Sequence, residues 1–184
     1  MRYIIFILIF FYPINIFASS KEMIKNKLYE TDNISFKFIQ KIGEKTEQGE
    51  CIILYPKKIL CRYDGKYKKI LVSNGKSLVI NSKKIKNYLR YQLKETPLDL
   101  ILDKKFLLDK LDQVETVKEN DETFSFKIVH NNNLLNIFFD KISYEIIGWT
   151  TTDIYLNKVE TRLSYIETNI MIDDRLFRIQ NYIN

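Results

Sequence analysis

The stretch GECIILYPKKILCRYD, residues 49–64, decides how the rest of the chain must fold. Two apolar runs, residues 51–55 and 59–63, flank a Pro-Lys-Lys triplet. Proline has no amide hydrogen and a fixed φ, so it belongs in a turn and not in a strand interior. The pattern predicts a β-hairpin in which Cys51 faces Cys61 and Ile53 faces Ile59. Because side chains alternate along a strand, one face carries the apolar and aromatic set Cys51, Ile53, Tyr55, Ile59, Cys61 and Tyr63.

The other face of the hairpin is apolar too, since it carries Ile52, Leu54 and Leu60. A hairpin that is covered on both sides indicates a curved sheet with something packed inside it.

Both cysteines of the chain lie in this hairpin. In an oxidising compartment a facing pair can form a disulfide, although the geometry across a hairpin is often strained for that bond. Two free thiols, buried as small apolar groups, are the alternative. The sequence leaves both alternatives open.

Residues 1–18 have the pattern of a secretory signal peptide, because a short basic start precedes an apolar run that ends at Ala18. A membrane anchor is the alternative. The run is short for a spanning helix, which needs about 20 residues, and Pro13 interrupts it. No cysteine lies near the expected cleavage point, so the mature protein is not expected to be lipidated. We therefore expect a soluble periplasmic protein whose residues 19–184 form a single domain.

The chain has a formal net charge of +6 and two lysine-rich stretches, residues 66–69 and 83–86. The simpler interpretation of these stretches is a solvated face. The functional interpretation is a weak attraction to anionic lipid head groups or to an acidic partner. Nucleic acid is not expected as a partner of an exported protein.

Period-two patterns recur after an expected N-terminal helix at Ser20–Thr31. The first strand places Phe36, Phe38 and Gln40 on one face, and a polar loop, residues 43–48, follows it. Turns are expected at residues 64–65, 74–75, 119–121 and 131–133. Further strands are predicted at residues 67–72, 77–81, 86–93, 114–118, 122–129, 134–140, 144–151, 159–167 and 176–180. A generous count gives about eleven strands, and their regular spacing predicts an antiparallel sandwich or an open barrel.

The period changes once, between residues 96 and 111. Thr96 is expected to cap a short helix, with Pro97 in its first position and Asp99 near its positive end. A second short apolar helix follows a polar break at residues 103–105. We expect both helices to cover a surface of the sheet.

No pattern of catalytic residues is evident. His130 is the single histidine, and it has no cluster of cysteines or carboxylates at ligand spacing. The sequence has no glycine-rich phosphate loop and no Gly-x-Ser-x-Gly motif. We therefore expect neither an enzyme nor a metal or other cofactor.

Several short motifs follow one another in a characteristic order. They are Phe36-x-Phe38-x-Gln40, Gly49 followed by Leu54-Tyr55-Pro56, Ser73-Asn74-Gly75, Thr96-Pro97-Leu98 with the apolar run after it, Gly148-Trp149 with Asp153, and Leu176-Phe177-Arg178-Ile179. In this order, behind a signal peptide, the set resembles the periplasmic outer-membrane lipoprotein carrier family, LolA, over nearly the whole mature chain.

The resemblance implies a mainly β fold, an unclosed antiparallel β-barrel of about eleven strands with short α-helices forming a lid over the concave face. It implies a carrier, expected to be monomeric, that binds the acyl chains of lipidated proteins. Such a carrier receives its cargo from an inner-membrane lipoprotein-releasing ABC transporter and delivers it to an outer-membrane lipoprotein acceptor where one is present. The alternative is a periplasmic domain that senses or binds lipoproteins or lipids without transport.

The resemblance also suggests which residues meet the cargo. The acyl-chain cavity is expected to be lined by Phe36, Phe38, Ile53, Tyr55, Ile59, Cys61 and Tyr63, and the lid to use Leu98, Ile101, Leu102 and Phe106. The alternative is that all of these residues are ordinary core. One position departs from the family, which usually has an arginine before the hairpin proline, where it hydrogen-bonds the lid. Tyr55 stands there in this chain, and its hydroxyl can donate one hydrogen bond at most.

Overall fold

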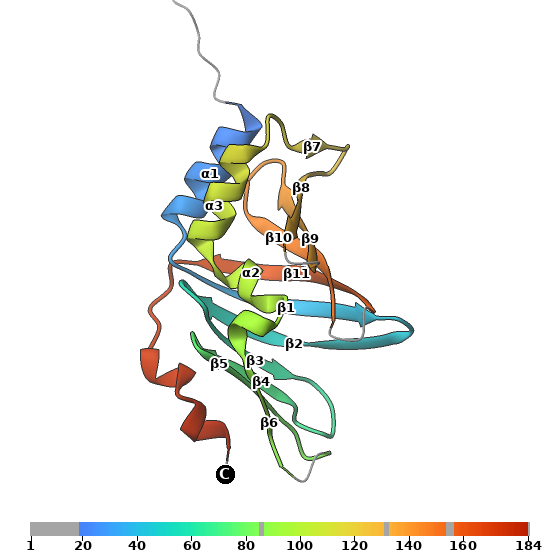
Figure 1. Ribbon diagram of the computed structural model, residues 1–184, viewed down its shortest axis with the longest axis vertical. Helices are drawn as coiled ribbons and strands as arrows, with labels where there is room; N and C mark the ends of the chain where they lie inside the picture. Colours follow the sequence, from blue (N-terminus) through green and yellow to red (C-terminus); the bar gives the residue numbers. More distant parts are fainter. Residues whose placement is uncertain (1–18, 85–86, 131–132, 154–156, 184) are drawn as a thin grey trace, which may run out of the picture.

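The computed structural model describes residues 19–84, 87–130, 133–153 and 157–183. Its strands form one antiparallel sheet in the order β6-β5-β4-β3-β2-β1-β11-β10-β9-β8-β7, so β6 and β7 are the two edges (Figure 1). The strands are β1 Asn33–Ile42, β2 Lys45–Leu54, β3 Lys58–Tyr63, β4 Ile70–Asn74, β5 Ser77–Asn81, β6 Leu89–Gln92, β7 Lys118–Glu119, β8 Thr123–His130, β9 Asn133–Asp140, β10 Ile146–Thr152 and β11 Lys158–Thr168. The expected fold class, an open antiparallel half-barrel of eleven strands with a helical cover, is confirmed.

Most strands pair with their neighbours in sequence, and one long-range pairing joins the two ends of the chain. β1 pairs with β2 on one side and with β11 on the other. The predicted hairpin is β2–β3, and its register places Cys51 opposite Cys61 and Ile53 opposite Ile59, as expected.

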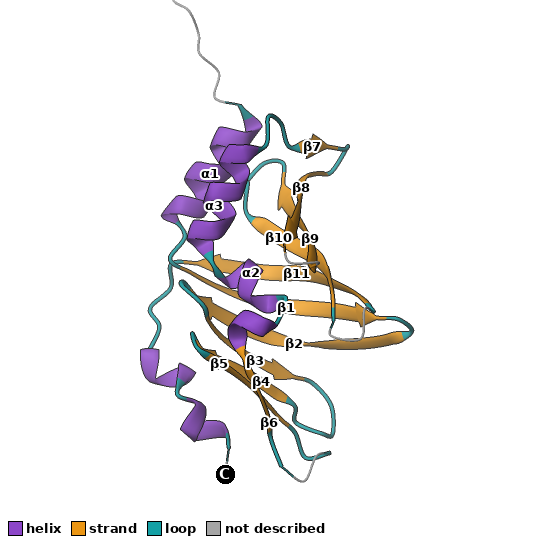
Figure 2. Ribbon diagram, viewed as in Figure 1, coloured by secondary structure: helices purple, strands orange, loops and turns teal. Residues whose placement is uncertain are grey.

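The helices lie together on one side of the sheet (Figure 2). They are α1 Ser20–Glu30, α2 Leu98–Leu102 and α3 Lys104–Gln113, with a 3-10 turn, η1 Leu93–Glu95, before α2. α1 and α3 lie side by side, and α2 crosses the middle of the sheet near β1 (Figure 1).

Side chains cap α1 and α3, but the expected cap of α2 by Thr96 is wrong, and Pro97 is the N-cap residue of α2 and not its first helical residue. The Ser19 side chain accepts a hydrogen bond from the Glu22 amide at the start of α1. The Thr96 hydroxyl does not cap α2, because it donates to the Leu93 carbonyl at 2.8 Å. The Asp103 carboxylate caps α3 by accepting from the Phe106 amide at 3.0 Å.

The last predicted strand, residues 176–180, is wrong. This segment forms two 3-10 turns, η2 Asp174–Phe177 and η3 Ile179–Tyr182. The segment is not a strand of the sheet and packs on it through side chains. Phe177 and Ile179 form a second apolar cluster with Leu60, Val72 and Val79. The sheet is therefore covered on both faces here, as the two-sided hairpin indicated.

Several boundaries also differ from the expected ones. β2 begins at Lys45, so the polar loop is only a two-residue turn at Gly43-Glu44. β4 begins at Ile70, because a turn closed by the Lys68 amide and the Gly65 carbonyl precedes it. The strand expected at residues 114–118 is reduced to β7, since the Val114 amide still bonds to the Leu111 carbonyl at the end of α3. The strand expected at residues 86–93 is confined to β6.

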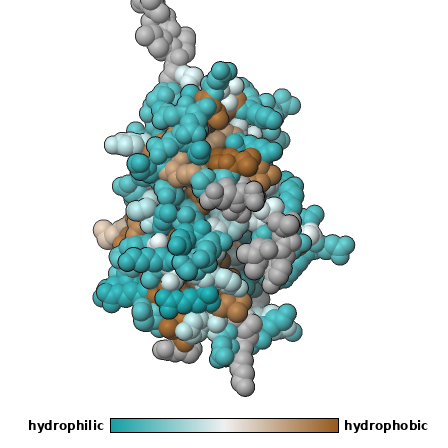
Figure 3. Space-filling view, viewed as in Figure 1, coloured by the Kyte–Doolittle hydropathy of each residue, from teal (hydrophilic) through white to brown (hydrophobic). Residues whose placement is uncertain are grey.

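The signal peptide expected at residues 1–18 lies outside the described residues, as do residues 131–132 of an expected turn. None of the described helices has the length and apolar character needed to cross a membrane. Figure 3 shows the face seen in Figure 1 as mainly hydrophilic, with a hydrophobic patch beside the helices in its upper half.

Candidate functional site

A cavity of about 390 Å³ lies between the inner face of the sheet and α2. Its volume is within the range of about 300–1,000 Å³ that is usual for ligand pockets. Strand β1 supplies Phe36 and Phe38 to its wall, and α2 supplies Leu98 and Ile101. Alternation along β1 explains this arrangement, because Lys37 and Ile39 between and beside the two phenylalanines are exposed.

Seven of the eleven residues expected at the cavity or the lid border this space. They are Phe36, Phe38, Ile59, Cys61, Tyr63, Leu98 and Ile101. The other four lie elsewhere. Ile53 and Leu102 are fully buried in the adjoining core, and Tyr55 is buried with them. Phe106 is half-buried and stacks edge-on against His130, with 5.1 Å between the ring centroids.

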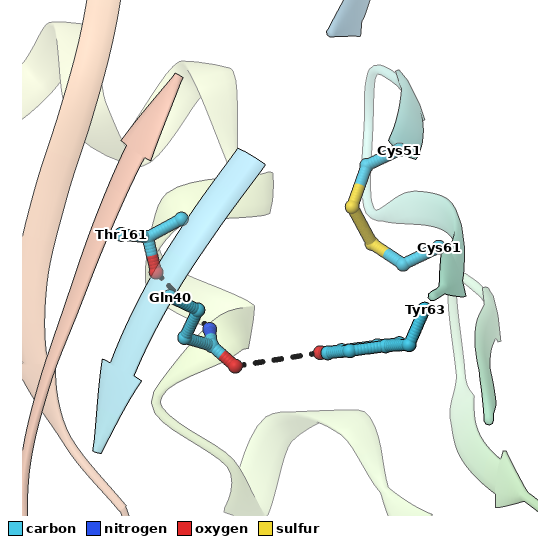
Figure 4. Close-up of a disulfide and its surroundings, with 5 residues drawn as sticks. All are labelled: Gln40, Cys51, Cys61, Tyr63 and Thr161. Atoms are coloured by element: carbon cyan, nitrogen blue, oxygen red, sulfur yellow. Dashed lines mark hydrogen bonds between the residues drawn. A yellow bond between two sulfur atoms is a disulfide. The ribbon is translucent and has the colours of Figure 1, made fainter. Parts of the chain in front are cut away.

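Cys51 and Cys61 form a disulfide across the β2–β3 hairpin, and both residues border the cavity (Figure 4). Of the two alternatives that the sequence left open, the disulfide is the one present. It joins neighbouring strands of the cavity wall covalently.

A row of polar side chains crosses the cavity wall beyond the disulfide (Figure 4). The Gln40 side chain donates to the Thr161 hydroxyl at 3.1 Å and accepts a long hydrogen bond, 3.5 Å, from the Tyr63 hydroxyl. Thr151, on the strand next to β11, also borders the cavity, and its buried hydroxyl oxygen has no partner among the described residues. The cavity is thus apolar beneath α2 and polar at its other end.

A charged pair stands beside this polar row. The Lys69 ammonium group lies 3.6 Å from the centroid of the Tyr63 ring and is hydrogen-bonded to the Glu47 carboxylate. Burial lowers the pKa of Lys69 below its usual value. Burial opposes the charge of Glu47, but hydrogen bonds from Lys45 and Lys69 hold the pKa of its carboxyl below the usual value. Burial raises the pKa of the Tyr63 hydroxyl well above its usual range.

The helical cover is attached to the hairpin turn through Lys57. The Lys57 amide donates to the Leu102 carbonyl at 2.8 Å, and its ammonium group lies 3.0 Å from Asp99 and 3.1 Å from Asp103. Burial disfavours the charge of Lys57, but the two carboxylates raise its pKa above the usual value. Asp99 and Asp103 stand at the start and the end of α2, so one lysine holds both ends of this helix.

Tyr55 makes no such attachment. Its hydroxyl oxygen is buried and has no hydrogen-bond partner among the described residues. The hydrogen bond that the sequence allowed for this position is therefore absent, and Lys57, two residues later in the turn, makes the contact with the cover.

Sequence reasoning did not find Lys57, Lys69 or the threonines of the polar row. A signal for the polar row was present, because Gln40 continues the inward alternation of Phe36 and Phe38. No local pattern could pair Lys57 with acids more than 40 residues away. Among the described residues, no group of three or more His, Cys, Asp and Glu side chains is placed to hold a metal ion.

Comparison with solved structures gives matches of low sequence identity. A DUF1329 family protein from Desulfovibrio piger has a TM-score of 0.50 and 8% identity, with 89% of this chain and 97% of that chain covered. A LolA superfamily protein from Nitrosomonas europaea has a TM-score of 0.48 and 7% identity, covering 89% and 100%. The MucA/MucB complex of Pseudomonas aeruginosa has a TM-score of 0.46 and 13% identity, covering 86% and 60%.

A search of curated proteins finds no match. Comparison with protein families is decisive, because the family described as outer membrane lipoprotein carrier protein LolA matches residues 30–180. The match begins at the end of α1 and includes all the strands and the segment that packs behind β3 and β4. The chain therefore belongs to the family of the outer membrane lipoprotein carrier protein LolA.

Proposed function

We propose that this protein is a periplasmic carrier, not an enzyme, that binds the acyl chains of lipoproteins and moves them from the inner to the outer membrane. The observation that carries the proposal is the cavity beneath α2, whose wall is mainly apolar and aromatic, in a chain of the lipoprotein carrier family. Its partners are an inner-membrane lipoprotein-releasing ABC transporter and, where one exists, an outer-membrane acceptor.

The energetics of acyl chains explain why such a cavity is needed. Transfer of hydrocarbon out of water stabilises the complex by about 0.8 kcal/mol per CH₂, so a long chain contributes about 10 kcal/mol. A carrier has to provide a comparable apolar surface and yet release the chain. A cavity wall that is partly a short helix meets both needs, because the helix can move without unpairing the sheet.

In this proposal α2 is the movable part of the wall. Its Leu98 and Ile101 side chains border the cavity, while the neighbouring Leu102 is fully buried. α2 is only five residues long, and Lys57 holds it through Asp99 and Asp103. Entry of a chain would displace Leu98 and Ile101, and the Lys57 ion pairs would set the position to which α2 returns.

The polar end of the cavity suits the part of the cargo that is not hydrocarbon. Acyl chains of a lipoprotein end in ester and amide carbonyl groups, which accept hydrogen bonds. The hydroxyl groups of Tyr63, Thr151 and Thr161 are donors of the matching kind. We therefore place the chain beneath α2 and its carbonyl end toward Gln40.

A release assay tests the proposal. Purified protein, added to spheroplasts of its host, is expected to release lipoproteins into a soluble one-to-one complex in a way that depends on the ABC transporter. A Phe38→Asp variant, which places a charge in the cavity wall, is expected to release none, while Ile39→Asp, on the exposed face of the same strand, is the matched control. Absence of release by the folded wild-type protein would contradict transport, and lipid extracted from the protein would then support a sensing or lipid-binding role.

A further inference from the structure

The described residues of the two lysine-rich stretches meet at one corner of the molecule. They occupy the β3–β4 loop and the β5–β6 loop, which emerge next to each other at the lower right of Figure 1. The Lys83 amide donates to the Tyr67 carbonyl at 2.8 Å and joins the loops. Residues Lys66, Tyr67, Lys68, Lys83 and Lys84 are all exposed, and we call this group the cationic rim.

Tyr67 is the centre of the cationic rim. Its ring is 43% exposed, and the ammonium groups of Lys66 and Lys84 lie 4.9 and 5.7 Å from its centroid. None of the four lysines of the rim forms an ion pair within the part of the chain that the structure describes. The rim thus presents four positive charges around one aromatic side chain.

The cationic rim lies at the edge of the cavity. Tyr63 and Lys69 flank the first loop, and Ile80 and Leu89 lie at the two strand ends that the second loop connects. All four of these residues border the cavity. Whatever binds the rim therefore lies next to this edge of the cavity.

We propose that the cationic rim binds the surface of an anionic lipid bilayer and places the cavity opening against it. Lysines are attracted to an anionic lipid surface, and tyrosine is favoured at the level of the head groups. Tyr88 and Leu89 beside the rim are 37% and 45% exposed, which adds apolar contact. An acidic protein would be met by the same charges, but an anionic bilayer combines a charged surface with an apolar layer directly beneath it, which suits the exposed Tyr67, Tyr88 and Leu89 side chains. The proposal concerns membrane binding and does not require that the cargo be a lipoprotein.

The test measures binding of residues 19–184, which contain every described helix and strand, to phosphatidylcholine vesicles with and without phosphatidylglycerol. The wild-type protein is expected to sediment with the anionic vesicles only, and about 0.5 M salt should release it, because the Debye length falls to a few ångströms. The variant Lys66→Gln/Lys83→Gln/Lys84→Gln should lower the partition coefficient by about tenfold or more. The matched control, Lys105→Gln/Lys118→Gln/Lys127→Gln, removes the same amount of charge from exposed positions away from the rim. It should change the partition coefficient by less than about twofold.

A second measurement leaves the lysines unchanged and detects the contact of Tyr67 with the bilayer. Tyr67→Trp places a reporter at the centre of the rim, and its fluorescence should shift to shorter wavelength when anionic vesicles are added. The native Trp149 is buried and gives the background, which the wild-type protein measures. Failure of the wild-type protein to bind anionic vesicles, or equal loss in both triple variants, would overturn the proposal. An acidic protein partner would be the alternative in the first case.

Discussion

Tyr55 shows what a single residue changes in this family. It stands before the hairpin proline, its hydroxyl is buried, and no described residue accepts or donates a hydrogen bond to it. Burial raises the pKa of Tyr55 well above its usual range, so the group stays neutral. A buried polar group without a partner costs about 1–3 kcal/mol. The contact between the hairpin turn and the cover is made by Lys57.

Removal of the Tyr55 hydroxyl is therefore expected to do no harm. Tyr55→Phe should leave the free energy of unfolding unchanged or raise it by about 1 kcal/mol, measured by urea denaturation. Tyr182→Phe is the control, because the Tyr182 hydroxyl donates to the Leu176 carbonyl at 2.9 Å. The free energy of unfolding of Tyr182→Phe should fall by about 1 kcal/mol. A loss as large as this in Tyr55→Phe would mean that the hydroxyl is bonded after all.

Glu47 makes stability depend on pH at the polar end of the cavity. Its pKa is lowered in the folded protein, so its contribution is full above the unfolded value of 4.5 and is lost as the pH falls through the folded value. Glu47→Gln should lower the free energy of unfolding by about 1 kcal/mol at pH 7, and the difference from wild type should shrink below about pH 4.5. Urea denaturation of both proteins between pH 7 and pH 3 measures this difference in the free energy of unfolding. Glu50→Gln, at an exposed position of the same strand, is the control, and a difference that persists at pH 3 would contradict the assignment.

At the scale of elements, the β2–β3 hairpin owes part of its stability to the disulfide. Cys51 and Cys61 are ten residues apart, and closure of a loop of this size corresponds to about 2–3 kcal/mol in the chain-entropy account. Cys51→Ala/Cys61→Ala should lower the free energy of unfolding by this amount. A reducing agent should lower the stability of the wild-type protein in the same way and leave that of the variant unchanged. Equal sensitivity of both proteins to the reductant would contradict the prediction.

The short helix α2 should separate packing from ligand binding. Leu102→Ala removes a fully buried side chain and should cost about 2–5 kcal/mol in stability. Leu98→Ala, at the half-buried cavity wall, should cost less and instead change the affinity for an acyl ligand. Urea denaturation and titration with a fluorescent fatty acid measure the two effects. The proposed division of roles fails if Leu98→Ala binds the probe as the wild-type protein does.

At the scale of the whole molecule, the sheet has two apolar faces with separate tasks. The inner face borders the cavity, and the outer face of β3, β4 and β5 is covered by Phe177 and Ile179 from the C-terminal segment. The long-range pairing of β1 with β11 brings that segment back to the N-terminal half of the sheet. We therefore expect that stability and the binding of a ligand in the cavity can be altered independently.

Phe177→Ala tests this separation. The side chain is 2% exposed, so its truncation should cost about 3–5 kcal/mol in the free energy of unfolding. The folded fraction should still bind an acyl probe with unchanged affinity, because Phe177 does not border the cavity. Tyr165→Ala, at a position that is 80% exposed, should change stability by less than about 0.5 kcal/mol. Loss of acyl affinity in folded Phe177→Ala would show that the two faces are coupled.

The sequence by itself determined the features that local alternation and turn chemistry control. The β2–β3 register follows from the position of Pro56 between two apolar runs, and the inward direction of Phe36 and Phe38 follows from the two-residue period of a strand. The open half-barrel was predictable too, because the strand count and the helical interruption both agree with the family. Residues 176–180 have the same kind of apolar content but form 3-10 turns, and their Phe177 and Ile179 side chains pack on the outer face of the sheet.

Only the tertiary structure decided which distant residues meet. It pairs Lys57 with Asp99 and Asp103, leaves the Tyr55 hydroxyl without a described partner, and places two lysine stretches around Tyr67 at the edge of the cavity. It also separates Leu98 and Ile101, which border the cavity, from Leu102, which does not. These outcomes depend on the curvature of the sheet and on the crossing of α2. Such relations hold between elements, and alternation within one element carries no information about them.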